Sequence, residues 1–321
     1  ARASQPVHRA DRCETDDAAA YEQANVHAYV VLLISVYDVI AYHFSSTRYK
    51  VARAHALTQP WPLIPQFLAT FAPGSLGADL GCGNGKYLHL RSAFGPGPDA
   101  ALVTLGSDRC APLVEDAQHN FPQPGTKSMH EVAVADALHS QLRSAAFVCT
   151  WLTQDYAISI ATIHHFSTPE RRMRAVQEMI RLVRPVPRME PQSDGLGEGP
   201  GRFLIFVWAY EQRGGGRRQF DTVLPDDQAT QDVLVPWVMT SQHAPETREE
   251  QVPNDVGTEE CAHLDYHLFR EGELEDLVAW AVRDLAQGAA GDTKPAPLAV
   301  PQVASGWDKG NWWGIWRVEH A

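Results

Sequence analysis

Three glycines on alternate positions follow a short apolar segment near residue 80, and they constrain the fold of this chain more than any other feature. The segment covers residues 75–80, and Gly81, Gly83 and Gly85 come directly after it. Glycine has no Cβ, so the backbone can pass close beneath a ligand. A helix start after such a loop presents free N–H groups to the same ligand. The stretch predicts a strand, a ligand-binding loop and a helix, although a plain tight turn would use the same glycines.

Two common nucleotide-binding motifs do not fit this loop. A dinucleotide fingerprint has its third glycine where this chain has Lys86, and a P-loop has Ser or Thr where it has Tyr87. An acidic residue, Asp79, precedes the G-x-G-x-G pattern. That order resembles motif I of the class I S-adenosylmethionine-dependent methyltransferases.

Short, nearly continuous apolar runs recur along the chain and are separated by segments with helical spacing. They cover residues 76–80, 102–106, 132–135, 156–161 and 203–208. Such runs are typical of buried parallel strands. We therefore expect an α/β fold, a class I methyltransferase Rossmann-like sheet that is mostly parallel, with helices on both faces. An aromatic and β-branched segment at 311–318 is the expected antiparallel last strand.

Three segments carry helix signals. Residues 22–44 can form a helix. A second helix has Thr168 as its cap, Pro169 at its first position and Pro185 as its stop, with apolar residues at helical spacing: Met173, Val176, Ile180 and Val183. A third begins near Glu271, and its apolar positions are Leu274, Leu277, Val278, Ala281 and Leu285.

Composition narrows the class of protein. The formal charge of −12 argues against a protein that coats nucleic acid by bulk electrostatics. The five scattered cysteines include no C-x-x-C pair, so we expect reduced thiols and no metal site. No apolar run reaches about eighteen residues and no signal peptide pattern opens the chain. We expect no membrane association and a cytoplasmic location, with the nucleus as a second location.

The expected organisation is one large domain with long loops. Residues 1–20 are polar and predicted to be a disordered tail. Residues 21–321 are predicted to form the methyltransferase domain, and its long loops are expected at 186–201, 212–219, 240–262 and 286–306.

Polar residues follow the predicted strands at the edge where open α/β sheets bind ligands. Asp108 could accept both hydroxyls of a ribose or cap the next helix. Asp136 could accept from an adenine amino group or serve a turn. His164 and His165 lack a third ligand at metal-binding spacing, so we expect one packed histidine and place His165 in the pocket.

Arginines gather at 171–188 and at 213–218. The sequence leaves two interpretations open: a solvated helix and loop face, or a basic strip for a phosphate backbone.

Further motifs resemble a narrower family, the eukaryotic tRNA wobble-uridine carboxymethyl methyltransferases, which includes a methyltransferase domain fused to an AlkB-type oxygenase in animals. The motifs keep the family's order from about residue 37 to the C-terminus. They include V-Y-D-V-I-A at 36–41, H-F-S-S-T-R-Y at 43–49, P-W-P at 60–62, I-H-H-F-S-T at 163–168, V-W-A at 207–209 and N-W-W at 311–313.

This resemblance implies methyl transfer from S-adenosylmethionine to the carboxylate of 5-carboxymethyluridine at the tRNA wobble position. It also implies two partners, the anticodon arm of tRNA and a small zinc-binding methyltransferase activator subunit that forms a heterodimer. An apolar edge strand such as 132–135 is the expected docking edge for that subunit. Two alternatives stay open: a methyltransferase for another RNA or a small carboxylate, and an inactive scaffold that only binds S-adenosylmethionine.

The resemblance also assigns roles to residues. The implied catalytic residues are Arg48, His165 and Trp208. The implied cofactor-binding residues are Arg48, Tyr49, Asp79, Gly81, Cys82, Gly83, Asn84, Gly85, Asp108, Arg109, Asp136, Ala137 and Ile160. The implied substrate-binding residues are Tyr49, Trp208, Arg171, Arg172, Arg217 and Arg218, with Trp208 available to stack on the base.

Three short segments, 28–35, 51–59 and 148–154, interrupt motifs that otherwise resemble the family. Two of them begin with Val and end with Gln, as the translated ends of a GT…CAG intron would. We interpret the three segments as very short introns retained in the coding sequence, a hypothesis that sequencing of the transcript tests.

Overall fold

The computed structural model describes residues 37, 40, 41, 44, 45, 61–88, 102–119, 129–140, 142, 154–188, 195–213, 231–237, 262–288 and 297–321. The predicted tail and Arg48, Tyr49, Arg217 and Arg218 lie outside the described residues, as do nearly all residues of the three interrupting segments. Of the predicted helix 22–44, the described residues Tyr37, Ile40, Ala41 and Phe44 are helical.

The centre of the structure is a seven-stranded sheet with the order β3-β2-β1-β4-β5-β10-β9. The five predicted strands are confirmed as parallel neighbours: β1 (Leu76–Leu80), β2 (Val103–Asp108), β3 (Met129–Val134), β4 (Tyr156–Ile160) and β5 (Arg202–Trp208). The predicted last strand is β10 (Asn311–Arg317), which runs antiparallel to β5. The mostly parallel Rossmann-like sheet expected from the sequence is therefore confirmed.

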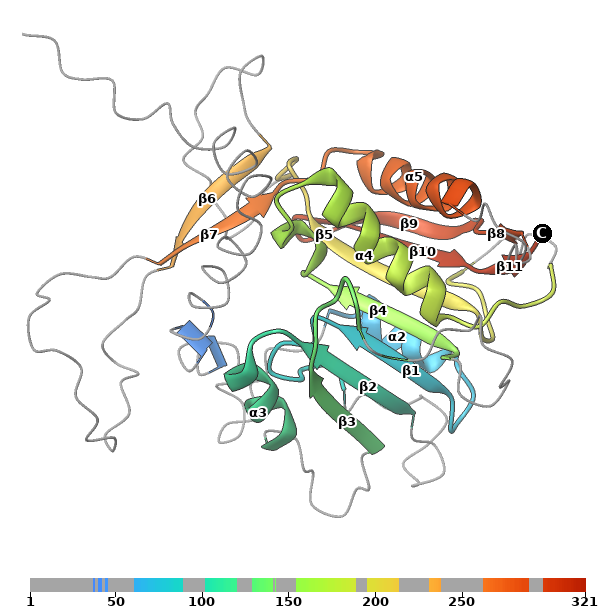
Figure 1. Cartoon of the computed structure of the whole chain (residues 1–321), viewed down its shortest axis with the longest axis horizontal. Helices are drawn as coiled ribbons and strands as arrows, with labels where there is room; N and C mark the ends of the chain where they lie inside the picture. Colours follow the sequence, from blue (N-terminus) through green and yellow to red (C-terminus); the bar gives the residue numbers. More distant parts are fainter. Residues whose placement is uncertain are drawn as a thin grey trace, which may run out of the picture.

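Helices cover both faces of the sheet (Figure 1). The helices α4 (Pro169–Leu182) and α5 (Glu273–Gly288) pack together on one face, where their buried residues join those of β4 and β5. The short helix α2 (Leu63–Ala69) packs on the other face against side chains of the same strands. The helix α3 (Ala111–His119) contacts β2 and β3.

The predicted start of α4 is confirmed in detail. Thr168 is the N-cap, its side-chain oxygen accepts a hydrogen bond from the backbone N–H of Arg171, and Pro169 occupies the first turn. The apolar face of the helix is buried, as its spacing predicts. In α5 one apolar position differs from the expectation, because Leu285 is 37% exposed near the end of the helix.

The predicted loop 286–306 contains regular structure. Within 286–306, α5 continues to Gly288, and the strands β8 (Leu298–Ala299) and β9 (Gln302–Asp308) follow. β8 pairs with β11 (Glu319–His320), and β9 forms the edge of the main sheet beside β10. The expectation of one long loop there was wrong, because those residues form strands that pair with the C-terminal segment.

A two-stranded ribbon forms a separate antiparallel sheet. It consists of β6 (Asp232–Trp237) and β7 (Ala262–His267), and no strand was predicted for either segment. Figure 1 shows the ribbon extending away from one end of the main sheet. β7 contacts the short 3-10 turn η2 (Ile163–His165), which follows β4.

None of the helices in the described parts of the chain combines the length and apolarity that a membrane span requires.

Candidate cofactor and active site

The three alternating glycines all adopt positive φ, at +78° for Gly81, +54° for Gly83 and +80° for Gly85. A Cβ on Gly81 would lie 2.3 Å from the side chain of Thr162, so this glycine lets the loop cross the end of β4. Among the described residues, a Cβ on Gly83 would meet a ring carbon of Phe44 alone, at 3.9 Å. The described residues after the loop, up to 88, form turns rather than the predicted helix. Gly83 is thus the position where the backbone borders open space.

Backbone and side-chain hydrogen bonds fix this loop to the end of β2. The amides of Gly81 and Cys82 donate to the carbonyl oxygen of Ser107 over 2.8 and 2.9 Å. The amide of Gly83 donates to Oδ2 of Asp108 over 2.9 Å, and the amide of Cys110 donates to Oδ1 over 2.9 Å. The Asp108 carboxylate is therefore held in one orientation between the loop and the start of α3.

A cavity of about 250 Å³ opens at the carboxyl ends of β1, β2 and β4. This is the position where open α/β sheets bind ligands, beside the switch in strand order around β1. Most of the predicted site residues that the structure describes line it: Asp79, Gly81, Cys82, Gly83, Asn84, Asp108, Arg109, Asp136, Ala137, Ile160, His165, Arg171 and Trp208. Gly85 and Arg172 are not among the lining residues.

Asp79 is the most unusual side chain of the cavity wall. It is 1% exposed, and neither carboxylate oxygen has a hydrogen-bond partner within the described residues. The amide nitrogen of Asn84 is likewise buried without a partner in that part of the chain. Burial, and then the charge of Asp108, raise the pKa of the Asp79 carboxyl to about 8. A buried carboxylate that borders a cavity in this way is suited to a ligand that brings a cationic or hydrogen-bond-donating group.

Asp108 also borders the cavity, and the pKa of its carboxyl is likewise raised. Burial raises the pKa of its carboxyl, and the backbone N–H groups of Cys110 and Gly83 act against that rise. Each carboxylate oxygen accepts one backbone hydrogen bond and keeps a lone pair for a second. The sequence left two roles open for Asp108, a cap of the next helix and a cavity ligand. In the structure Asp108 contacts the start of α3 and also borders the cavity.

Asp136 also occupies both of its predicted environments. Its Oδ1 accepts a hydrogen bond from the amide of Leu138 over 3.0 Å, as a turn aspartate does. Its Oδ2 lies 3.1 Å from a guanidinium nitrogen of Arg109, and both side chains are partly exposed on the cavity wall.

Another part of the cavity wall is aromatic. The rings of Trp208 and Tyr266 stack with centroids 4.0 Å apart and planes 8° apart, and the ring of His165 lies 4.5 Å from that of Tyr266. The hydroxyl of Tyr37 is hydrogen-bonded to Nε2 of His165 over 2.9 Å. His164 is 1% exposed, and its Nδ1 accepts a hydrogen bond from the amide of Trp208 over 3.1 Å. His164 is thus the packed histidine of the pair, although both rings border the cavity.

The backbone between the two walls is strained. Ala161, directly after β4, has a φ of +59°, which side-chain-bearing residues seldom adopt. Its amide donates to the carbonyl oxygen of Phe206 over 3.0 Å, and the hydroxyl of the next residue, Thr162, donates to the carbonyl oxygen of Gly81 over 3.2 Å. Strain of this kind is typical of functional sites, where neighbouring contacts hold the conformation.

One predicted substrate residue is placed where it cannot meet a phosphate. Arg172 is 4% exposed, and its guanidinium donates to the carbonyl oxygens of Phe166 and Ser167 over 2.6 and 3.1 Å. The prediction for Arg172 was wrong, because helical periodicity turns this residue towards the core. Arg171 instead lies on the cavity wall, with its guanidinium 5.6 Å from the ring centre of Phe166.

Several lining residues were not among the predicted site residues: Tyr37, Phe44, Trp61, Thr162, His164 and Tyr266. Tyr37, Phe44 and Trp61 stand in the motifs at 36–41, 43–49 and 60–62, so the motif positions were the available signal. Tyr266 lies in β7, and the alternation of polar and apolar residues over 263–268 was the available signal for that strand.

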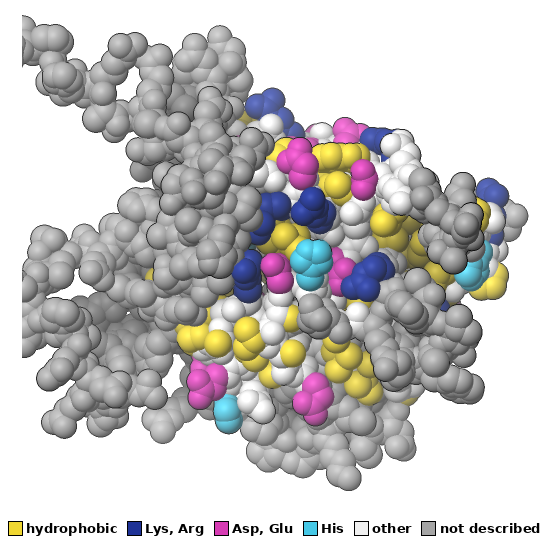
Figure 2. All heavy atoms as spheres, in the orientation of Figure 1, with side chains coloured by type: hydrophobic (Ala, Val, Ile, Leu, Met, Phe, Trp, Pro, Cys, Tyr) yellow, Lys and Arg dark blue, Asp and Glu magenta, His cyan; other side chains and the backbone are white. Residues whose placement is uncertain are grey.

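The outer face of α4 carries mixed charge. Figure 2 shows Lys and Arg side chains interspersed with Asp and Glu over the region that α4 crosses. The exposed arginines there include Arg174, Arg181 and Arg184. Arg181 pairs with Glu178, and Arg184 lies 2.6 Å from Asp155. This face therefore carries both positive and negative side chains at the helix surface.

In the described residues, no three His, Cys, Asp or Glu side chains lie close enough together to hold a metal ion.

Comparisons with known proteins found methyltransferases among the similar chains. A family model described as a methyltransferase domain matches residues 78–186, which run from the glycine loop through α4. A solved methyltransferase in complex with the Haloferax volcanii Trm112 methyltransferase activator has a TM-score of 0.48 and 13% identity, covering 90% of this chain and 98% of its own.

Two yeast proteins named tRNA (carboxymethyluridine(34)-5-O)-methyltransferase are more similar in sequence. The Saccharomyces cerevisiae protein is 37% identical over 73% of this chain and 64% of its own length. The Schizosaccharomyces pombe protein is 35% identical over 92% of this chain and 96% of its own length. Because the similarity spans nearly the whole of both chains, this chain belongs to the tRNA (carboxymethyluridine(34)-5-O)-methyltransferase family.

Proposed function

We propose that this protein transfers the methyl group of S-adenosylmethionine to the carboxylate of 5-carboxymethyluridine at position 34 of tRNA. The product is the methyl ester, 5-methoxycarbonylmethyluridine. The observation that carries the proposal is the buried Asp79 carboxyl group, which has no hydrogen-bond partner among the described residues and borders a cavity at the carboxyl ends of the strands. The chain's family is named for this reaction.

The residues present fit the cofactor. Asp79 has two free carboxylate oxygens within the described residues and would hold the ammonium group of the methionine end. Asp108 retains lone pairs for the ribose hydroxyls, and Asp136 borders the cavity where it can accept from the adenine amino group. Gly83 keeps the loop open, because a Cβ there would point into this space.

The reaction needs alignment more than proton transfer. When bound, S-adenosylmethionine supplies a methyl group on a positively charged sulfur. The acceptor carboxylate is ionised at neutral pH, because carboxyl groups titrate near pH 4, so no general base is required. Well-oriented reactants can gain roughly 7–11 kcal/mol from proximity. We assign that alignment to the aromatic wall of His165, Trp208 and Tyr266, which also limits water around the reacting atoms.

Two partners follow from this function. Arg171 on the cavity wall is our candidate contact for an anticodon-arm phosphate, together with Arg217 and Arg218, which lie outside the described residues. The second partner is a small zinc-binding activator subunit that docks on β3. β3 is the last strand on its side of the sheet, and Val134 on it is 57% exposed. An exposed apolar edge strand can accept a strand from a partner.

The test of the function is a nucleoside analysis. The full chain, co-produced with a zinc-binding activator, is incubated with S-adenosylmethionine and two otherwise identical tRNAs, one with carboxymethyluridine at position 34 and one with uridine. We expect the methyl ester only in the first tRNA. Binding of S-adenosylmethionine without turnover would support an inactive scaffold, and methylation elsewhere in both tRNAs would support another RNA target.

The docking test is separate. Val134→Asp places a charge on the β3 edge, and we expect it to abolish co-purification with the activator while leaving the fold intact. An undiminished complex would overturn the assignment of this edge.

A further inference from the structure

The β7 strand presents two different faces to the rest of the molecule. Tyr266 and Leu268 belong to a cluster with Trp208, on the cavity side. His267 and Phe269 point the other way: their rings lie 4.9 Å apart, and Phe269 packs into the core beneath α4 and α5. This alternation is the ordinary period of an extended strand. Whatever holds His267 therefore also sets where Tyr266 stands in the cavity wall.

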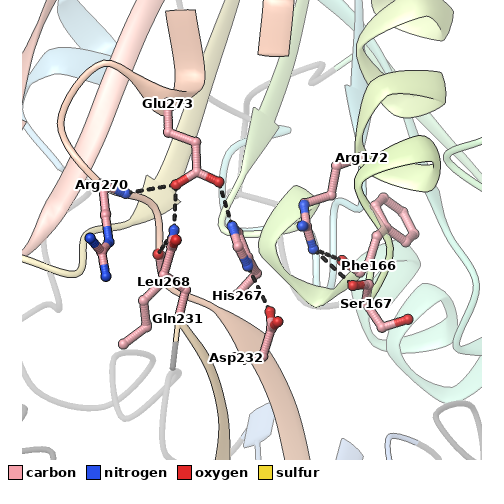
Figure 3. A network of polar contacts seen from close by, with 9 residues as sticks. All are labelled: Phe166, Ser167, Arg172, Gln231, Asp232, His267, Leu268, Arg270 and Glu273. Atoms are coloured by element: carbon pink, nitrogen blue, oxygen red, sulfur yellow. Dashed lines mark hydrogen bonds and ion pairs between the residues drawn. The ribbon is translucent and has the colours of Figure 1, made fainter. Parts of the chain in front are cut away.

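His267 is held at both ring nitrogens. It is 7% exposed, its Nδ1 lies 2.6 Å from Oδ1 of Asp232, and its Nε2 lies 2.6 Å from Oε1 of Glu273. Asp232 is the first residue of β6 and Glu273 the first of α5. Figure 3 shows the three side chains in a line that joins the ribbon to the helix. We refer to Asp232, His267 and Glu273 as the His267 clamp.

The second carboxylate oxygen of Glu273 extends the clamp. Oε2 accepts hydrogen bonds from the amide of Arg270 over 2.9 Å and from the side-chain amide of Gln231 over 2.5 Å. The same Gln231 nitrogen donates to the carbonyl oxygen of Leu268 over 3.0 Å. One carboxylate at the start of α5 thus ties together the residue before β6 and the turn after β7 (Figure 3).

Two carboxylate partners require a doubly protonated imidazole ring, because the neutral ring donates only one hydrogen bond. Burial alone would lower the pKa of His267, but the hydrogen bonds to Asp232 and Glu273 hold the pKa above its ordinary value of 6.5. Arg172 on α4 acts in the opposite direction. For Glu273, burial alone would raise the pKa, and the hydrogen bonds from His267 and the Arg270 amide outweigh it, so the pKa is lowered.

We propose that His267 is a positioning residue, and that the His267 clamp holds Tyr266 stacked on Trp208 and so sets the shape of the methyl-transfer pocket. Neither His267 nor its two carboxylates line the cavity, so they act through Tyr266. This inference rests on the proposed function, because the pocket that it shapes is the one assigned to the carboxymethyluridine. It adds a residue group outside the cavity to the determinants of that reaction.

The clamp gives the reaction a pH dependence with a definite sign. The groups that face His267 are Asp232 from β6, Glu273 from α5 and Arg172 from α4. Because the folded pKa of His267 is raised, the contribution of the clamp is complete below about pH 6.5 and is lost as the pH rises through the folded value. The turnover number should fall as the pH rises above about 6.5 through the folded pKa of His267.

Three variants, His267→Asn, Glu273→Gln and Tyr266→Leu, test the proposal in the full chain with its activator, and a fourth serves as the control. His267→Asn removes the imidazolium, and we expect kcat to fall about tenfold or more, because small misplacements in a pocket are costly. The affinity for S-adenosylhomocysteine, measured by calorimetry, should stay within about twofold of wild type, because the acids that hold it are untouched. His320→Asn is the matched control: it makes the same change at an exposed histidine on β11 and should leave kcat unchanged.

The other two variants separate positioning from general stability. Glu273→Gln keeps the shape but removes one negative charge, so the alkaline fall in kcat should begin at a lower pH. Tyr266→Leu should lower kcat by itself, and His267→Asn added to it should cost nothing further, because both changes act on one stack. Additive losses, or an unchanged pH profile in Glu273→Gln, would overturn the proposal. Glu273→Gln carries the test even where His267→Asn fails to fold.

A readout without turnover separates this proposal from the proposed function. Lack of activity of the wild-type complex on carboxymethyluridine tRNA would contradict the function alone. The ring resonances of Tyr266 would then be followed by NMR as His267 titrates. Shifts of both residues with one midpoint above pH 6.5 would support the clamp. A His267 midpoint at or below that value, or Tyr266 shifts independent of it, would overturn it.

Discussion

Two buried ionisable side chains, Asp79 and Arg202, lie at opposite ends of the parallel strands, and their surroundings differ completely. Asp79 stands near the carboxyl end of β1, where its oxygens have no partner among the described residues. Arg202 is the first residue of β5, at the other end, and is 0% exposed. Its guanidinium donates to the carbonyl oxygens of Leu196, Gly197 and Gly199 over 2.7–2.9 Å and to the Thr70 hydroxyl over 2.7 Å.

The arginine is also covered by aromatic rings. Its guanidinium lies 4.4 Å from the ring centre of Phe71 and 5.3 Å from that of Phe67. Burial, and then the charge of Arg317, lower the pKa of Arg202 to about 9. The glycines at 197 and 199 have φ values of +72° and +78°, which aim their carbonyl groups at this cation. A buried cation with four hydrogen bonds fixes one geometry of the chain, whereas a buried carboxyl group at a cavity, without partners among the described residues, is poised for a ligand.

The largest expected effect concerns the buried Arg202. Arg202→Met leaves several buried carbonyl groups without a donor, so the free energy of unfolding should fall by about 3–5 kcal/mol. Urea unfolding measures the loss. The protein that remains folded should bind S-adenosylhomocysteine as wild type does.

Arg184→Met is the control for that change, since Arg184 is exposed and forms one surface ion pair, with Asp155. It should cost less than about 1 kcal/mol. Equal losses in the two variants would contradict the structural role of Arg202.

The next largest effect concerns Asp108 on the cavity wall. Asp108→Ala should weaken S-adenosylhomocysteine binding about a hundredfold, or ~2.7 kcal/mol, because it removes the acceptor that Gly83 and Cys110 orient. Calorimetry measures the affinity. Asp136→Ala, which removes a partly exposed acid, should cost about tenfold or less, and unchanged affinity in Asp108→Ala would refute the ribose assignment.

A smaller effect is the release of a proton from Asp79 when the ligand binds. With a folded pKa of about 8, Asp79 is largely protonated at pH 7 and must lose that proton to pair with an ammonium group. Binding at pH 7 should therefore release a proton, detected by calorimetry in buffers of different ionisation enthalpy. Asp79→Asn should abolish the release and weaken binding about tenfold.

The same pKa predicts how stability depends on pH. The folded carboxyl keeps its proton between its ordinary value of 3.8 and about 8, where the unfolded chain has lost it. Without ligand, the free energy of unfolding should then decline as pH rises through this window, and the decline attributable to this residue should vanish in Asp79→Asn. An identical slope in both proteins would show that Asp79 is ionised when folded.

The smallest effect concerns strain at the cavity. Ala161→Gly removes a side chain from a backbone with positive φ, so stability should rise by less than about 1 kcal/mol while kcat falls. Lys309→Gly makes the same kind of change at φ +47°, away from the cavity wall, and should affect stability alone. A rise in kcat for Ala161→Gly would show that the strained turn does not support catalysis.

The features that could be predicted from the sequence are those that a local residue pattern determines. Thr168, Pro169 and the apolar stripe behind them predicted α4, because capping and periodicity act within one segment. The acids that end β1 and β2 were found because strand ends and glycines mark the ligand edge.

What failed depends on distant partners. The β6–β7 ribbon pairs Asp232 with His267 across a long intervening segment, so neither strand on its own indicates which partner it has. Two arginines were missed although their partners are near in sequence. Arg172 faces the core by the periodicity of α4, and its acceptors are the carbonyl groups of Phe166 and Ser167 in the loop just before the helix. Arg202 was overlooked because its acceptors, such as the carbonyl groups of Leu196 and Gly197, belong to a loop. The glycine-rich sequence predicts that loop but not its conformation.

The outer edge of β3 has a practical consequence for work with the isolated chain. In the described part of the sheet this strand has a neighbour on one side alone, and Ala133 and Val134 are exposed on it. Such an edge can template strand-to-strand aggregation. Preparations made without a binding subunit should therefore precipitate more readily as they are concentrated, and a lysine in place of Val134 should keep them dispersed.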